Sequence, residues 1–353
     1  MRILVINPGS TSTKFAVYEG ETPLLLRSIR HKPEELAPYK TILDQFDFRY
    51  NLVMNEIKVT NVDFNFKAVI GRGGLGKAVP GGVYEINEQM LEDTRNSPRE
   101  HACNLGCLIA DKIAKQIPGC RSFIADPVVV DELNDYARIC GIPEIERCSI
   151  WHPLNQRAIA RRFAREIGKK YEEMNLIICH LGGGISVAAH EKGVAVDANN
   201  ALDGEGPFTP ERAGTVPAAD LVRLCFSGKY TQEEILKFIT GKGGLNALLG
   251  TTDLIEIQER IQNGDERAKL VLDAMIYHVA KQIASESAVL CGKIDAILLT
   301  GGMAHSEYLI AELRKRIDFL APTYCFPGED EMGALAGNAY AVLRGTREAK
   351  EYK

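Results

Sequence analysis

The chain lacks any hydrophobic run long enough to cross a membrane. Its apolar stretches fall well short of the about 20 residues that a membrane-spanning helix needs. Only four apolar residues follow Arg2 before the polar Asn7, which is too few for the core of a signal peptide. We therefore expect a cytoplasmic protein without a membrane partner.

An excess of basic residues is also missing. The sequence holds 42 lysines and arginines against 47 aspartates and glutamates, for a formal net charge of −5. This balance gives no basic field for nucleic acid or anionic lipid, so no nucleic-acid partner is expected. Hydrophobic residues make up 45% of the 353 positions, as in a globular protein, and the length favours two domains.

Paired cysteine spacing is absent as well. The nine cysteines are odd in number and scattered, which favours reduced thiols over a disulfide framework. Cys103 and Cys107, with His101 nearby, resemble half of a zinc site, but no second pair lies at ligand spacing. We expect no zinc there.

A strand–glycine turn–strand unit occurs twice, half a chain apart. Residues 2–6 and 14–18 flank the first turn, and residues 175–179 and 185–190 flank the second. Asn7 and His180 hold equivalent places just before their glycines. Such a repeat predicts two related domains, which we place at residues 1–150 and 151–330.

Strand-like and helical stretches alternate between and after these units. Strands are expected at 67–70, 122–126 and 294–300, and helices at 104–117, 153–167, 218–226, 232–240, 265–290 and 331–343. This alternation predicts an α/β fold. The charged residues 346–353 are expected to fray.

Residues 71–77, GRGGLGK, match both a dinucleotide-binding turn and a P-loop. Both of these need the last glycine to open a helix whose amides hold phosphate. The next residues, AVPGG, cannot propagate a helix, and Ala78 lacks the hydroxyl that a P-loop offers to Mg²⁺. We reject both interpretations.

A stronger phosphate signal comes from three glycine-rich elements. The first, residues 7–14, combines free amides with hydroxyls and a terminal lysine, which suit a phosphate group. The other two are the triple glycine 182–184 and the pair Gly301–Gly302 after a buried strand, where ligands of α/β folds sit. Together they predict a nucleotide between two duplicated halves.

Residues 6–14, INPGSTSTK, and 179–186, CHLGGGIS, resemble the two signatures of the acetate and butyrate kinases. This acetokinase family belongs to the acetate/sugar kinase, Hsp70 and actin superfamily, and residues 199–217 are similar to its butyrate kinase branch. The resemblance covers residues 1–345. It implies a duplicated actin-like, ribonuclease H-like ATPase fold with a βββαβαβα core in each domain. The nucleotide would lie in the interdomain cleft, and the C-terminal segment 331–353 would pack back on the first domain.

The same resemblance implies transfer of the γ-phosphoryl group of ATP, with Mg²⁺, to the carboxylate of butyrate by direct, reversible in-line attack. Acetate, propionate or isobutyrate are alternative substrates. An actin- or Hsp70-like ATPase and a sugar kinase remain alternative classes. A homodimer or higher homo-oligomer is expected.

Site roles follow from the matched positions. The resemblance assigns the reaction itself to Arg72, Asp126, His152, His180 and Arg212. It assigns the nucleotide to Asn7, Ser10, Ser12, Lys14, Gly182, Gly183, Gly184, Gly301 and Gly302. It assigns the metal to Asn7, Asp126 and Glu331, with Glu329 as the alternative acid in that loop.

Asp126 is not expected to act as a general base. A short fatty acid resembles Glu, with a pKa of about 4.3, and is already ionised at neutral pH. Asp126 is better suited to hold Mg²⁺ through water or to orient the arginines.

Two glycines after Arg72 suggest the acyl pocket. Acetate kinases carry bulky valines there, so Gly73 and Gly74 would leave room for a longer chain, each buried CH₂ contributing about 0.8 kcal/mol. The other pocket residues that we expect are His101, Trp151 and Pro210.

Overall fold

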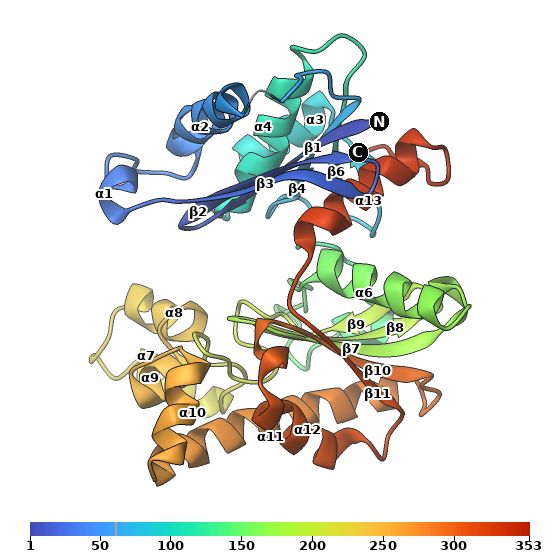
Figure 1. Ribbon diagram of the computed structural model, residues 1–353. Helices are drawn as coiled ribbons and strands as arrows, with labels where there is room; N and C mark the ends of the chain where they lie inside the picture. The colour runs from blue at the N-terminus through green and yellow to red at the C-terminus, as the bar shows by residue number, and fades with distance from the viewer. Residues whose placement is uncertain (61) are drawn as a thin grey trace. The chain divides into compact units, whose positions relative to one another are not determined.

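The computed structural model describes residues 1–60 and 62–353, which form two compact units (Figure 1). Unit 1 comprises Met1–Val130 and Asp330–Lys353, and unit 2 comprises Asp131–Glu329. The first division falls earlier in the chain than the boundary expected near residue 150.

Unit 1 is built on a seven-stranded sheet with the order β12-β5-β6-β4-β1-β2-β3. Its strands are β1 (Arg2–Gly9), β2 (Ser12–Glu19), β3 (Thr22–Arg30), β4 (Ala68–Arg72), β5 (Val83–Glu85), β6 (Arg121–Ala125) and β12 (Ala349–Lys350). Its helices are α1 (Pro33–Leu36), α2 (Phe46–Val59), α3 (Glu88–Arg95), α4 (Leu105–Ala114) and α13 (Glu331–Leu343). The helices α4 and α13 cover opposite faces of the sheet (Figure 1).

Unit 2 holds a five-stranded sheet with the order β11-β10-β7-β8-β9. Its strands are β7 (Asn175–Leu181), β8 (Ile185–Glu191), β9 (Val194–Ala198), β10 (Ala296–Gly301) and β11 (Thr323–Pro327). Its helices are α5 (Asp135–Arg138), α6 (Pro153–Glu166), α7 (Ala218–Cys225), α8 (Gln232–Thr240), α9 (Gly244–Leu249), α10 (Leu254–Gln262), α11 (Glu266–Val289) and α12 (Glu307–Ile317).

The faces of the second sheet follow the alternation of its strands. Ile177 and Cys179 of β7 pack with α11 and α12 in one buried cluster. Leu176 and Ile178 point the other way and pack with Phe163 of α6. Successive side chains of a strand face opposite sides, so apolar residues at every position demand a helix layer on both faces.

The two sheets share one topology, which confirms the predicted duplicated α/β fold. In β3-β2-β1-β4-β6 and in β9-β8-β7-β10-β11 the first two pairings are antiparallel and the last two are parallel. The carboxyl ends of the parallel strands therefore meet at one edge of each sheet, where α/β folds bind their ligands.

The C-terminal tail corrects one expectation, because residues 346–353 are not frayed. Strand β12 pairs with β5, and Tyr352 is only 5% exposed. The Tyr352 hydroxyl donates to Asp93 at 2.9 Å, and the Lys350 ammonium donates to the Gly81 carbonyl. A buried aromatic ring thus holds a segment whose composition resembles that of a loose terminus.

Residues 71–77 run from the end of β4 into a loop, and no helix follows before α3 within this described stretch. The rejection of the dinucleotide and P-loop patterns is therefore confirmed.

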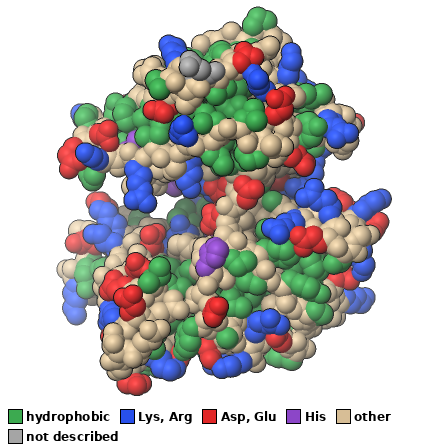
Figure 2. Space-filling model, in the orientation of Figure 1, with side chains coloured by type: hydrophobic (Ala, Val, Ile, Leu, Met, Phe, Trp, Pro, Cys, Tyr) green, Lys and Arg blue, Asp and Glu red, His purple; other side chains and the backbone are tan. Residues whose placement is uncertain are grey.

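No helix of the described chain is long and apolar enough to span a membrane. On the face that Figure 2 shows, basic and acidic side chains are interspersed over both units.

Candidate functional site

Three predicted site residues lie at neighbouring strand ends in unit 1. Asn7 lies near the end of β1, Arg72 ends β4, and Asp126 directly follows β6. The register pairs Ile6 with Gly71 and Arg72 with Ala125, so the three parallel strands end side by side. The fold therefore gathers residues that are far apart in the sequence.

Glu331, the first residue of α13, joins this edge. Its Oε2 accepts hydrogen bonds from Asn7 Nδ2 at 2.7 Å and from Arg72 Nη1 at 2.8 Å. The Glu331 side chain is 12% exposed and that of Arg72 is 22% exposed. Asn7 keeps its own carbonyl oxygen available, because the Asn7 amide nitrogen makes the contact with Glu331.

Asp126 adopts a left-handed backbone conformation, with φ of 39°. Its Oδ1 accepts a hydrogen bond from Gly82 N at 2.8 Å, and its own N–H donates to the Gly82 carbonyl. The residue is 2% exposed. A non-glycine residue held at positive φ is strained and is typical of a functional position.

Arg49 of α2 supports the first glycine turn, and nothing in the sequence motifs pointed to it. Its guanidinium donates to the carbonyls of Gly9 at 2.8 Å, Ser12 at 2.9 Å and Ser10 at 3.2 Å. Burial lowers the Arg49 pKa to about 10, and the side chain has no exposed surface. By binding the turn's carbonyls from behind, Arg49 fixes its backbone shape.

The remaining residues of that turn differ in exposure. Lys14 is exposed on β2 and stands opposite Asn7 in the strand register, while Ser12 is half-buried. The exposed Ser10 hydroxyl lies 3.4 Å from His101 Nε2. His101 Nδ1 accepts the backbone N–H of Cys103 at 3.2 Å, so His101 belongs with this turn.

The structure gives Gly73 and Gly74 a packing role. A Cβ at Gly73 would lie 2.5 Å from Pro127 Cβ, and one at Gly74 would overlap the Asn104 carboxamide and lie 2.6 Å from its Cα. Asn104 holds this loop by accepting the Leu75 N–H at 2.7 Å. Protein atoms occupy the space that a side chain at Gly73 or Gly74 would enter. The expectation that these glycines leave room for a longer acyl chain is therefore wrong.

In unit 2 two histidines stack. The rings of His152, which precedes α6, and His180 of β7 lie 3.8 Å apart at 11°. His180 Nδ1 lies 2.8 Å from Asn155 Oδ1, and His180 Nε2 lies 3.0 Å from Glu329 Oε1. The two acids that the sequence left as alternatives thus have different partners, Glu329 in unit 2 and Glu331 in unit 1.

Arg212 lies against the triple-glycine turn. A Cβ at Gly184 would overlap its guanidinium, which donates through Nη1 to the Ala201 carbonyl. Burial lowers the pKa of Arg212, and its Nε is buried without a hydrogen-bond partner among the described residues. The nearby charges of Glu211 and Asp203 offset part of this effect of burial, and a guanidinium whose Nε lacks a hydrogen-bond partner is suited to an external anion.

Close contacts explain several of the other predicted site glycines in unit 2. A Cβ at Gly182 would lie 2.9 Å from His180 Nε2, whereas Gly183 and Gly302 face more open space. Gly301 has φ of 93° and packs against the Leu181 backbone. Glycine therefore lets side chains and strands approach at Gly182, Gly184 and Gly301.

Trp151 and Pro210 are both buried. The indole of Trp151 is 2% exposed and meets the His190 ring edge-on at 5.6 Å. The Pro210 carbonyl accepts a hydrogen bond from Asn246 N at 2.9 Å. Trp151 therefore contributes to the core beside His152, and the role of both residues in an acyl pocket stays a prediction.

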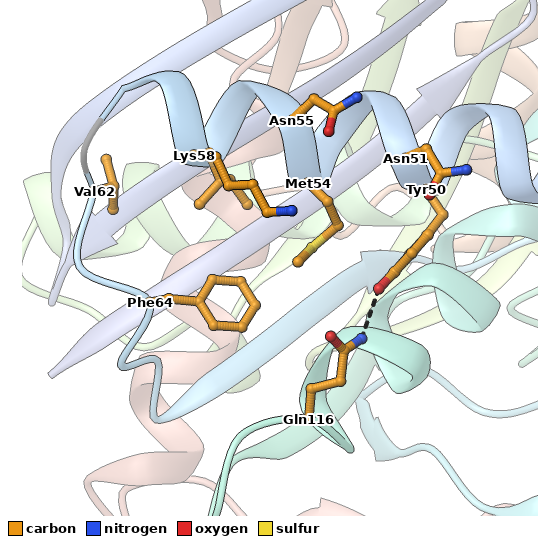
Figure 3. A pocket seen from close by; sticks show the side chains of 9 residues that line it. Tyr50, Asn51, Met54, Asn55, Lys58, Val62, Phe64 and Gln116 are labelled. Atoms are coloured by element: carbon orange, nitrogen blue, oxygen red, sulfur yellow. Dashed lines mark hydrogen bonds between the residues drawn. The ribbon is translucent and has the colours of Figure 1, made fainter.

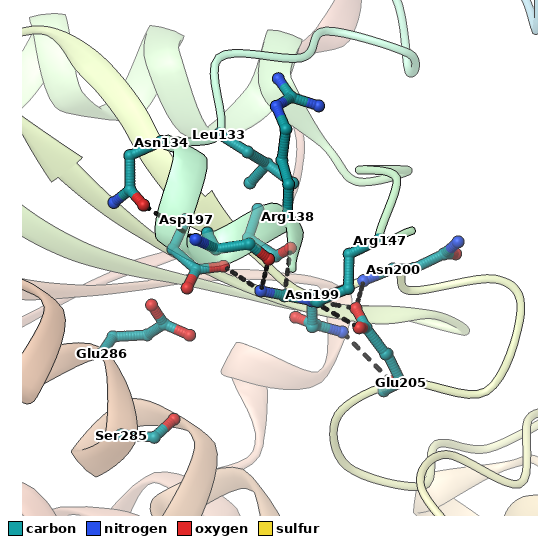
Figure 4. Close-up of polar contacts among 12 residues, drawn as sticks. Leu133, Asn134, Arg138, Arg147, Asp197, Asn199, Asn200, Glu205, Ser285 and Glu286 are labelled. Carbon is teal, nitrogen blue, oxygen red and sulfur yellow. Dashed lines mark hydrogen bonds and ion pairs between the residues drawn. The ribbon is translucent and has the colours of Figure 1, made fainter. Parts of the chain in front are cut away.

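A second arginine anchors the segment that carries Arg212 (Figure 4). Arg147 Nη1 lies 3.0 Å from Asp197, and Arg147 Nε donates to Glu205 at 2.7 Å. Glu205 in turn accepts the Asn200 N–H at 2.6 Å. This network fixes the start of residues 199–217, the stretch that resembles the butyrate kinases.

No group of three or more His, Cys, Asp or Glu in the described chain could hold a metal by itself. All nine cysteines are free thiols, and burial raises the pKa of Cys103 to about 11.

A hollow of about 650 Å³ lies beside α2, lined by residues that include Tyr50, Met54 and Phe64, and none of the predicted site residues lines it (Figure 3).

Known proteins resemble the chain over its whole length. Residues 148–320 match the model of the acetokinase family. A probable butyrate kinase of Bacteroides thetaiotaomicron is 61% identical over 353 residues, which is 100% of both chains. Butyrate kinase 2 of Clostridium acetobutylicum is 51% identical over 354 residues, covering 100% of this chain and 99% of the relative.

Solved structures confirm the actin-like fold. Acetate kinase of Porphyromonas gingivalis superposes with a TM-score of 0.79 at 20% identity, covering 97% of this chain and 99% of that one. A propionate kinase of Francisella tularensis gives 0.73 at 18% identity, covering 96% and 98%. With full-length relatives at more than half identity and this shared fold, the chain belongs to the acetokinase family.

Proposed function

We propose that this chain is an ATP-dependent kinase that transfers the γ-phosphoryl group to the carboxylate of butyrate, giving butanoyl phosphate and ADP. The observation that carries the proposal is the relative named a probable butyrate kinase, 61% identical over the full length. Two site clusters, one in each unit, support it because they contain the residues that this chemistry requires.

The unit 2 cluster is suited to an anion. Arg212 is a partly buried cation whose Nε has no hydrogen-bond partner among the described residues. Burial lowers its pKa although Glu211 and Asp203 lie nearby, and a desolvated charge is costly unless it is fully paired. A phosphoryl oxygen would supply that pairing, with a guanidinium as a fork-shaped donor. His152 would donate to the same class of ligand, and His180 would do so after its Nε2 exchanges the Glu329 carboxylate for the ligand. Such donors spread the charge of a phosphoryl group in flight.

The unit 1 cluster is suited to Mg²⁺ and a second anion. Mg²⁺ usually takes one or two protein carboxylates, keeps several waters and binds substrate phosphates. Asp126 and Glu331, with the Asn7 carbonyl oxygen, fit this pattern. Bound there, the ion would neutralise charge on the phosphates, while Arg72 would hold a carboxylate or phosphate oxygen.

No general base is required. The acid is ionised at neutral pH, so its carboxylate attacks the phosphoryl group in line without losing a proton. Asp126 is therefore assigned to the metal or to orientation. ATP as the donor, a cytoplasmic location and assembly as a homodimer or higher homo-oligomer belong to the same proposal.

A direct test is trapping of the acyl phosphate with hydroxylamine. The purified chain with Mg·ATP would be given acetate, propionate, butyrate, isobutyrate and valerate in turn. We expect the highest kcat/KM for butyrate, and ADP release that depends on the added acid. Arg212→Ala should cut kcat/KM by about 10²–10³, and exposed Arg223→Ala on α7 is the matched control. ADP release at the same rate without any acid would overturn the proposal.

A further inference from the structure

A continuous chain of hydrogen-bonded side chains leads to His152 inside unit 2. Tyr171 Oη lies 2.7 Å from His190 Nδ1, and His190 Nε2 lies 3.0 Å from Gln156 Oε1. Gln156 Nε2 lies 3.0 Å from Ser186 Oγ, which lies 2.8 Å from His152 Nδ1. His190, Gln156 and Ser186 have no exposed surface, so water does not compete within this chain of contacts.

The orientation of Gln156 is fixed by a backbone group. Its side-chain nitrogen also lies 3.1 Å from the Ser186 carbonyl oxygen, which can only accept a hydrogen bond. The amide NH₂ of Gln156 therefore faces Ser186, and its Oε1 faces His190. Because Oε1 can only accept, His190 must carry a hydrogen on Nε2.

His190 is neutral. Burial, followed by the charges of Arg157 and Arg161, lowers its pKa well below the ordinary value. A neutral imidazole with its hydrogen on Nε2 has a bare Nδ1, so the Tyr171 hydroxyl donates to it. Every donor in the chain of contacts then points in the same direction, towards Ser186.

The Ser186 hydroxyl continues this order of donors and acceptors to His152. Its oxygen already accepts a hydrogen bond from Gln156, and its hydroxyl has a single hydrogen to place. An acceptor in reach of that hydrogen is His152 Nδ1, at 2.8 Å. A His152 that accepts at Nδ1 keeps its hydrogen on Nε2.

We propose that the chain of contacts from Tyr171 through His190, Gln156 and Ser186 fixes the tautomer of His152, so that a neutral ring offers Nε2–H as a donor to an anionic oxygen. These four are positioning residues. The identity of that oxygen, on the phosphoryl group, rests on the proposed function, whereas the tautomer does not.

The stacked pair gives a neutral His152 an electrostatic advantage. Its ring lies 3.8 Å from that of His180, whose Nε2 is 3.0 Å from the Glu329 carboxylate. Two imidazolium rings at this distance would repel, since like charges disfavour each other's ionisation. Aligned hydrogen bonds in a buried chain also polarise one another, which strengthens the final donor without adding charge.

The tautomer can be read directly by NMR. Full-length protein labelled with ¹⁵N-histidine would be measured at pH 8, above the ordinary imidazole pKa of about 6.5, with His152 assigned by loss of its signals in His152→Gln. We expect His152 Nε2 to bear the hydrogen and Nδ1 to be bare. A hydrogen on Nδ1, or on both nitrogens, would overturn the proposal. This measurement needs no turnover, so its result does not depend on whether the proposed function is right.

Two variants test the origin of the preference. Ser186→Ala removes the donor to Nδ1, and Gln156→Glu removes the donor to Ser186; Ser122→Ala, at a buried serine of β6 in unit 1, is the matched control. We expect both tautomers of His152 in the first two variants and wild-type signals in the control. In the acyl phosphate assay kcat should fall about three- to tenfold, the effect of one weakened hydrogen bond, with KM for the acid unchanged. An unaltered His152 tautomer in folded Ser186→Ala would refute the role of this contact chain.

Discussion

One carboxylate oxygen of Glu331 accepts hydrogen bonds from Asn7 at 2.7 Å and from Arg72 at 2.8 Å. Arg72 lies 259 positions earlier in the chain and Asn7 lies 324 positions earlier. The C-terminal helix α13 therefore supplies an acid to strand ends formed by the first quarter of the chain. Its position lets Glu331 orient Arg72 and leaves its other oxygen for the metal ion that we propose.

Replacing Glu331 with glutamine should separate these roles from simple packing. Glu331→Gln keeps the shape but removes the charge that faces Arg72. We expect kcat/KM to fall by about 10² and the Mg²⁺ concentration for half-maximal rate to rise, because a carboxylate binds Mg²⁺ better than an amide does. Initial rates of butanoyl phosphate formation across a Mg²⁺ series measure both.

Glu329→Gln is the matched control for that assignment. Glu329 contacts His180 in unit 2, 3.0 Å from its Nε2, and not the Asn7–Arg72 pair. Its replacement should leave the Mg²⁺ requirement unchanged. If Glu329→Gln raised the requirement and Glu331→Gln did not, the metal would belong to Glu329.

A methyl group at Gly184 should disable Arg212 without touching its charge. The added Cβ would overlap the guanidinium, which must then leave the turn. We expect Gly184→Ala to lower kcat/KM by about 10²–10³, as Arg212→Ala should. Gly141→Ala is the control, since a Cβ there meets nothing within 4 Å.

The double variant makes this prediction sharper. If Gly184→Ala acts only through Arg212, then Gly184→Ala/Arg212→Ala should be no worse than Arg212→Ala alone, because changes that remove one interaction are not additive. Thermal unfolding of all the variants checks that unit 2 remains folded. If the losses in kcat/KM of the two single variants multiplied in the double variant, Gly184 would have a role separate from that of Arg212.

A side chain at Gly74 should damage the loop and leave chain-length preference as it was. A Cβ there would lie 2.6 Å from Asn104 Cα and 2.8 Å from Asn104 N, which are backbone atoms that cannot turn aside. We expect Gly74→Ala to destabilise the protein by about 1–3 kcal/mol and to lower turnover of all the acids by the same factor. Urea unfolding and the acid series measure these effects. A changed butyrate-to-acetate ratio at unchanged stability would instead restore the pocket-volume idea.

Gly74 illustrates what the sequence could and could not predict. The alternation of strand-like and helical stretches and the repeated glycine turn predicted a duplicated α/β fold. The family resemblance singled out Asn7, Arg72 and Asp126, and the structure shows that they lie at neighbouring strand ends. The reason for each glycine was hidden, because Asn104 and Arg212 approach through tertiary packing that leaves no local signal. Arg49 and Gln156 were missed for the same reason, since a buried polar residue within a helix resembles a surface one in sequence.

The C-terminal tail shows the opposite failure. Its charged composition predicted fraying, yet Tyr352 is buried against Tyr84, with ring centroids 6.4 Å apart. One aromatic residue and a two-residue strand decide the outcome, and neither carries a period that a sequence pattern could reveal.

Glu286 of α11 should make unit 2 less stable as pH rises. Burial, and then the nearby charge of Asp197, raises its pKa from the ordinary 4.5 to about 8. Figure 4 shows its carboxylate pointing towards Asp197, and its Oε2 has no hydrogen-bond partner among the described residues. Between these two pKa values the folded state holds a proton that the unfolded state has lost, so the contribution of Glu286 to stability is greatest below pH 4.5 and falls until about pH 8.

Glu286→Gln should remove this dependence. The amide oxygen of the new glutamine would accept the hydrogen bond that Gln282 Nε2 now donates to Glu286 at 2.8 Å. Its NH₂ group would face the Asp197 carboxylate as a donor. The variant should match the wild type near pH 4.5 and then gain on it by up to about 1.4 kcal/mol per pH unit, reaching a constant advantage above pH 8. Urea unfolding of both proteins from pH 5 to 9 measures the difference, with exposed Glu259→Gln on α10 as the control. Parallel curves for Glu286→Gln and the wild type would mean that Glu286 ionises in the folded protein as it does in the unfolded chain, and that Arg147 compensates its charge despite being paired with Asp197 and Glu205.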